Sequence, residues 1–244
     1  MIVVRWLVNS RIWVALAAAA WSAESFVRCD QWVRWTLVIH IFFLTWSAYL
    51  FLSDDAIRKY RFFVLTALTG VCVSFQGFES MLIPMLCVLP VLFYRTHWMP
   101  RSWSLSRFEL RNIPIINNMV IGYCWIVLCM LWPLHRSMVD ISLQLPFVIA
   151  SFFWITALSI SEDLFVEATP DATLRLLGPV RLRALGVMLI IAAMLISYWC
   201  EERQLSVWVS MAASLLLLLL LPGGKRTVHK SWLIDAMIVL RFPF

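Results

Sequence analysis

Long apolar runs constrain this chain more than any other feature. They follow one another along all 244 residues, and hydrophobic residues make up 62% of the sequence against 14% charged residues. A soluble domain of this length carries far more charge, and several runs approach the ~18 residues that indicate a bilayer span. Inside a bilayer only a helix satisfies the backbone hydrogen bonds of such a segment. We therefore predict an all-α polytopic membrane helix bundle, a single transmembrane domain covering residues 1–244.

About nine transmembrane helices are expected. The predicted spans are 11–26, 32–52, 62–78, 81–94, 115–134, 141–160, 184–200, 205–222 and 232–244. The fourth and ninth are short for a span, so eight helices are the alternative count. With a cytoplasmic N-terminus, alternate loops place most Lys and Arg residues on the cytoplasmic side, as the positive-inside rule requires. Topology therefore accounts for the net charge of +6, and no nucleic-acid partner is needed to explain it.

Two acidic stretches fall on the predicted cytoplasmic side. The stretch "SISEDLFVEATPDATLRLL" (159–177) holds Asp163, Glu167 and Asp171 at spacing i, i+4, i+8. On a continuous helix these carboxylates would share one face and repel one another, and a cation would remove that repulsion. Mg²⁺ takes such carboxylate oxygens together with substrate phosphates. Because Pro170 disfavours a helical conformation at Thr169, a solvated loop is the competing interpretation.

The second acidic stretch, "SDDAIRKYRF" (53–62), follows the second predicted span. Asp54 and Asp55 supply carboxylates, while Arg58 and Lys59 supply cations that could bind phosphate oxygens. Carboxylates for a metal beside cations for phosphate are typical of a diphosphate-binding site. The alternative is that the two aspartates cap a short helix.

A pair of amides begins the fifth predicted span. The stretch "LRNIPIINNMVIG" (110–122) places Asn117 and Asn118 at the start of an apolar run, where an amide is costly unless it is hydrogen-bonded. These side chains could bond a neighbouring helix or face a ligand. Both interpretations remain open from the sequence.

Together these stretches resemble the UbiA-like intramembrane prenyltransferases. That family carries an N/D-x-x-D-type motif in its first loop and a D-x-x-D or D-x-x-x-D-type motif in its second. Asp54 and Asp55 match the first motif, and Asp163, Glu167 and Asp171 match the second. The first motif lacks its usual Asn and its widely spaced second Asp, and the second has Glu in the middle.

The stretch 110–122 carries a third part of the resemblance. Arg111, Pro114 and Asn118 fall in register with the family's R-x-x-P-x-x-K-N pattern, and Asn117 replaces the lysine. The ending "WLIDAMIVLRF" looks like the last helix of shorter, divergent bacterial members.

The resemblance implies a Mg²⁺-dependent transfer of a prenyl group from a prenyl diphosphate to a lipophilic acceptor, among the lipids of a bacterial inner membrane. It assigns Mg²⁺ to Asp54, Asp55, Asp163, Glu167 and Asp171 as the catalytic set. It assigns the diphosphate to Arg58, Lys59, Arg111, Asn117 and Asn118. The alternatives are a non-catalytic lipid-binding relative and an unrelated multi-pass transporter or assembly protein.

Overall fold

The computed structural model describes a helical protein. It describes residues 12–52, 66, 69–70, 82–94, 109–165, 172–200, 202, 204–221 and 228–241. Every regular element in these ranges is a helix, which confirms the all-α prediction for this part of the chain. Three helices, Ile116–Arg136, Ile141–Phe165 and Thr173–Trp199, are long and apolar enough to cross a membrane. The count of nine spans and the cytoplasmic N-terminus stay predictions.

The helices follow the predicted runs closely. Their bounds are α2 Ile12–Arg28, α3 Trp35–Phe51, α5 Leu82–Met85, α6 Val88–Tyr94, η3 Leu110–Asn112, α7 Ile116–Ile126, η4 Val127–Leu131, α8 Trp132–Arg136, α9 Ile141–Phe165, α10 Ala172–Trp199, α11 Leu205–Leu220 and α12 Val228–Val239. The predicted span 62–78 lies almost wholly outside the described residues. Each of the other predicted spans overlaps at least one described helix.

Two predicted boundaries around the acidic stretch are wrong. Helix α9 continues past residue 160 to Phe165, and α10 begins at Ala172 rather than at 184. Apolarity marks only the buried or lipid-facing part of a helix, so it misses the turns that carry charge. Within α10 the chain bends at Gly178, where φ is +73° and Pro179 follows. A proline after a glycine with positive φ separates two helical pieces.

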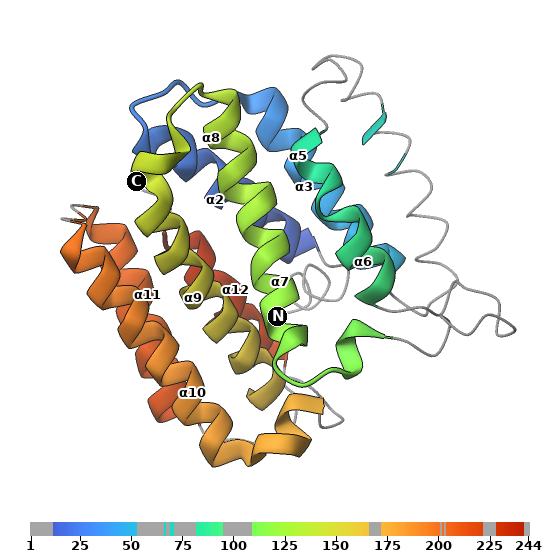
Figure 1. Ribbon diagram of the computed structural model, residues 1–244, viewed down its shortest axis with the longest axis vertical. Coiled ribbons are helices and arrows are strands. Elements are labelled where there is room, and N and C mark those ends of the chain that lie inside the picture. The colour runs from blue at the N-terminus through green and yellow to red at the C-terminus, as the bar shows by residue number, and fades with distance from the viewer. Residues whose placement is uncertain are drawn as a thin grey trace, which may run out of the picture.

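Helix α9 runs antiparallel to α7 and α10, whereas α2 runs parallel to the central rod and to α12 (Figure 1). Helices α7 and α8 and the π-helical turn η4 form one rod through the middle of the bundle, with α9 beside it. Helices α10 and α11 flank one side, and α3, α5 and α6 flank the other. The ends of α2, α8 and α10 therefore lie at one edge, and the ends of α3, α6 and α9 lie at the opposite edge.

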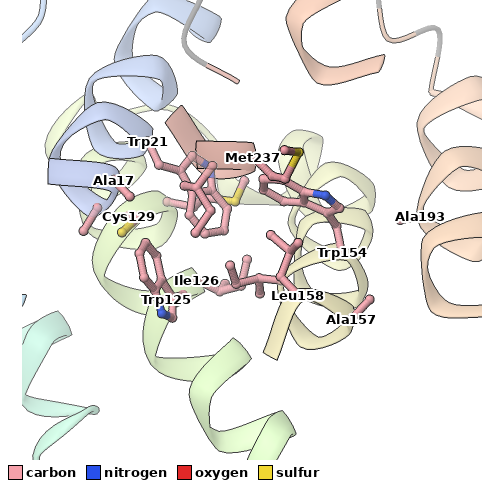
Figure 2. Packing of buried hydrophobic residues seen from close by; sticks show 14 of the residues in the cluster. Ala17, Trp21, Trp125, Ile126, Cys129, Trp154, Ala157, Leu158, Ala193 and Met237 are labelled. Atoms are coloured by element: carbon pink, nitrogen blue, oxygen red, sulfur yellow. The ribbon is translucent and has the colours of Figure 1, made fainter. Parts of the chain in front are cut away.

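Tryptophan side chains from three helices form the centre of the core. Trp21 of α2 stacks on Trp125 of α7 with centroids 5.9 Å apart, and meets Trp154 of α9 edge-on at 5.8 Å. Figure 2 shows these rings together with Met237 of α12. Aromatic pairs of this geometry stabilise by about 0.5–1.5 kcal/mol each beyond the area they bury. The cluster thus fixes α2, α7, α9 and α12 against one another.

A proline explains the π-helical turn in the central rod. Pro133 has no backbone N–H, so the carbonyl of Cys129 four residues earlier loses its usual helical donor. The hydroxyl of Ser25 donates to that carbonyl oxygen at 2.7 Å. The turn Val127–Leu131 directly precedes the proline, as π-turns do where the helical ladder is interrupted. A side chain from α2 therefore completes the hydrogen bonding of a neighbouring helix.

Candidate functional site

A buried polar cluster joins three helices at one edge of the bundle. Asn118 lies in the first turn of α7, and Asp163 in the last turn of α9; their residues are only 1% and 6% exposed. The Asn118 Nδ2 donates to Asp163 Oδ2 at 2.7 Å and to Ser159 Oγ at 3.1 Å. Thr173 of α10 donates through its hydroxyl to Asn118 Oδ1 at 3.2 Å. We call Asn118, Ser159, Asp163 and Thr173 the amide–carboxylate cluster.

The backbone before α7 is shaped to reach this cluster. Ile115 has φ +66° and ψ −47°, a conformation that a β-branched residue rarely adopts. Its N–H donates to the Thr173 hydroxyl oxygen at 2.9 Å. Such strain costs on the order of 1–3 kcal/mol and persists only where the surroundings impose it. Here the strained turn ties the start of α7 to α10 beside Asn118.

Further polar side chains surround the cluster. Tyr94, the last residue of α6, interacts electrostatically with Arg111 of η3, Asp163 and Glu162 of α9, and Tyr49 near the end of α3. The ends of α3, α6 and α9 lie with η3 at the same edge of the bundle. Helix α3, which precedes one predicted acidic stretch, and helix α9, which contains the start of the other, both end at this edge.

The structure describes four of the predicted site residues. Asn118 and Asp163 are bonded to each other, Asn117 is also buried at 2% exposure, and Arg111 lies near Tyr94. The remaining predicted residues lie outside the described part of the chain: Asp54, Asp55, Arg58, Lys59, Glu167 and Asp171. Helix α9 ends at Phe165, so a helical face shared by Asp163, Glu167 and Asp171 stays a prediction.

The donor chemistry at this edge fits a hard cation. Asp163 and Glu162 contribute carboxylates, and oxygen ligands of this kind are the ones that Mg²⁺ prefers. Across the described ranges, no three His, Cys, Asp or Glu side chains are grouped as a metal site. Mg²⁺ commonly takes only one or two carboxylates and completes its shell with water and substrate phosphates. Asp163 therefore suits the role of one ligand.

Sequence reasoning missed several members of this region. Ser159 and Thr173 are small hydroxyl residues within or beside apolar stretches, where they are usually unremarkable helix contacts. Reasoning also missed a second buried group at the opposite edge, formed by Glu24, Arg28 and Arg241. Glu24 carried a usable signal, because an acid inside an apolar run marks a paired or functional site.

No family model, curated protein or solved structure matches this chain.

Proposed function

We propose that this protein is a Mg²⁺-dependent, UbiA-like prenyltransferase of the bacterial inner membrane, acting on a prenyl diphosphate and a lipophilic acceptor. The supporting observation is the 2.7 Å hydrogen bond between Asn118 and Asp163, residues 45 positions apart. One belongs to the stretch that resembles R-x-x-P-x-x-K-N, and the other to the second acidic motif. The resemblance assigns both stretches to one site, and their side chains are in contact.

The described residues have separate roles in this proposal. Asn118 holds the Asp163 carboxylate in one orientation, and Arg111 offers a cation to phosphate oxygens. Mg²⁺, when bound with the diphosphate, would supply neutralising charge to the pyrophosphate. The apolar helices exclude water, which protects the reactive prenyl carbon from hydrolysis.

The reaction balances without any redox partner. The bond between the prenyl C1 and the diphosphate oxygen breaks, and pyrophosphate leaves with the electron pair. The acceptor forms a new bond to C1 through a nucleophilic carbon or oxygen, and then loses a proton. The driving features are positioning and charge stabilisation rather than covalent catalysis by the protein.

Donor binding to a matched pair of aspartate variants tests the proposal. The purified protein is mixed with radiolabelled farnesyl or geranylgeranyl diphosphate, with and without Mg²⁺. Asp163→Asn should weaken Mg²⁺-dependent binding by about tenfold or more, since a lost charged contact is worth about 1.4 kcal/mol. Asp140→Asn is the control, because Asp140 is exposed at the other end of α9 and accepts from the Ser142 N–H at 2.9 Å. Asn caps a helix as well as Asp does.

Two results would contradict the proposal. One is donor affinity that is the same with Mg²⁺ and with excess chelator. The other is equal affinity in the Asp163→Asn and Asp140→Asn variants, both of which must first elute as monodisperse helical protein.

The second candidate function is non-catalytic lipid binding. The amide–carboxylate cluster favours it, because the amide, carboxylate and hydroxyls already satisfy one another across three helices, as polar groups do when they hold membrane helices together. A lipid-binding relative would retain bound prenyl diphosphate without releasing pyrophosphate when a mixture of lipophilic acceptors is added. Failure to bind the donor at all would leave a multi-pass transporter or assembly protein.

A further inference from the structure

A second buried polar group lies at the edge opposite the amide–carboxylate cluster. Its centre is Arg241, which follows α12 and is 0% exposed. The Arg241 Nη2 donates to Ser151 Oγ of α9 at 2.8 Å, and its Nε lies 3.8 Å from Glu24 Oε2 of α2. A buried arginine requires a carboxylate and good packing to offset its desolvation. Here the carboxylate belongs to α2 and the hydroxyl to α9, and both helices are far from α12 in sequence.

Three aromatic rings surround the same guanidinium. Its central carbon lies 4.7 Å from the ring centroid of Phe147, 4.8 Å from that of Trp154 and 5.3 Å from that of Trp21. Cations within about 6 Å of a ring centroid are attracted by the negative face of the ring, and Arg is the commonest partner. Figure 2 shows Trp21 and Trp154 approaching from α2 and α9, with Met237 of α12 between the helices.

A neighbouring ion pair holds Glu24 in place. Arg28 donates to Glu24 Oε1 at 3.2 Å, pairs with Glu202 and reaches Gln204 Oε1 at 3.2 Å. The group therefore contains two cations and two carboxylates, and Arg28 remains paired whether or not Arg241 is present. The carboxylate facing Arg241 is thus held in position by residues other than Arg241 itself.

Few direct hydrogen bonds fix the guanidinium. Within the described structure, Arg241 Nε and Nη1, Glu24 Oε2 and Trp21 Nε1 are buried without a hydrogen-bond partner. Charge and ring faces therefore supply most of the attraction, and these suit any planar guanidinium cation. The surrounding side chains would therefore attract a guanidinium cation whether or not it is covalently part of this chain.

We propose that the chamber formed by Trp21, Glu24, Phe147, Ser151 and Trp154 is a guanidinium-binding site for which Arg241 is the tethered ligand. Docking of Arg241 closes the bundle by fastening α12 to α2 and α9. A chain that lacks this arginine should accept a free alkylguanidinium in its place. The inference is independent of the prenyltransferase proposal.

Chemical rescue tests the site. In detergent, Arg241→Ala should lower the Tm by roughly 10 °C, because removing one partner of a buried pair is strongly destabilising. Millimolar ethylguanidinium should then restore about half of that loss, since ligand that binds the folded state raises Tm by mass action. Ethylammonium, which has the same charge but no planar fork, should restore much less. Arg181→Ala, an exposed residue of α10, should neither lose stability nor respond.

Hydrogen exchange provides a second test that does not require the arginine variant to fold. Glu24→Gln should speed amide exchange at Leu240 and Arg241, whose N–H groups bond Ala236 and Ile238, at least tenfold. Glu202→Gln disrupts the same network but touches Arg28 rather than Arg241, so those amides should stay protected. Unchanged exchange in Glu24→Gln, or rescue of Arg241→Ala by ethylammonium equal to that by ethylguanidinium, would overturn the proposal.

Discussion

Single hydroxyl groups complete the backbone hydrogen bonding of this bundle. The Ser25 hydroxyl bonds the Cys129 carbonyl that Pro133 leaves without a helical donor. In a bilayer no water is available as a substitute, so the hydroxyl matters more than a surface one would. The proline is visible in the sequence, but Ser25 lies 104 residues from the Cys129 carbonyl that it bonds, and no local pattern identifies it.

We expect Ser25→Ala to lower the free energy of unfolding by about 1–3 kcal/mol, because a buried carbonyl is left unsatisfied. Ser22→Ala is the matched control in the same helix. The Ser22 hydroxyl bonds only Ala19 O in its own helix, at 2.8 Å, so its loss should cost little. Unfolding by denaturant in a fixed detergent measures both variants, and equal losses would contradict this account of Ser25.

At the scale of elements, a glycine sets how closely α7 approaches α9. A Cβ added at Gly122 would lie 2.5 Å from Thr156 Oγ1 and 3.3 Å from Phe152 Cε2. Small residues allow such close backbone approach between membrane helices. The contact keeps Asn118, one turn earlier on α7, within hydrogen-bond reach of α9.

Gly122→Ala should therefore destabilise the protein by about 1–2 kcal/mol, because overpacking outweighs the ~1 kcal/mol gain in helix propensity. Adding Thr156→Ala removes the clashing oxygen and should recover most of the loss. Thr156→Ala alone is the control, since its buried hydroxyl has no hydrogen-bond partner among the described residues. A double variant no more stable than Gly122→Ala would show that the contact is not limiting.

The sequence predicts the presence of these helices better than it predicts the residues at which they begin and end. Apolar length identified α2, α3, α9 and α11, because the bilayer requires an uninterrupted apolar surface of about that length. The early start of α10 was not predicted, because its first turns carry Arg175 and Arg181 and include the bend at Gly178.

Of the candidate site, Asn118 and Asp163 were predicted. Ser159 and Thr173 were not, since a hydroxyl in a helix has no pattern that distinguishes a site.

At the scale of the whole molecule, the two buried polar groups lie at opposite edges of the bundle. The amide–carboxylate cluster links the ends of α7, α9 and α10, whereas Arg28 links α2 to the segment after α10. The part of α10 after Pro179 spans about 30 Å, the thickness of a bilayer core. The two ends of α10 should therefore emerge on opposite sides of the membrane.

Labelling from one side of the membrane tests this topology. In a chain whose other cysteines are replaced, the exposed Cys200 should react with an impermeant maleimide added outside the cell. A Leu176→Cys variant that also lacks Cys200 should react only after permeabilisation, because Leu176 is 62% exposed at the other end of α10 and faces the cytoplasm in the predicted orientation. Labelling of both positions from the same side would contradict a spanning α10.

The Arg241 contact also has a consequence for biosynthesis. Glu24 is synthesised well before Arg241, so α2 can enter the membrane before this partner exists. Among the described residues, the cation that pairs with Glu24 before then is Arg28 of its own helix. The pairing of Glu24 with Arg241 is therefore a late step, which joins α2 to α12 only after the helices between them have been synthesised.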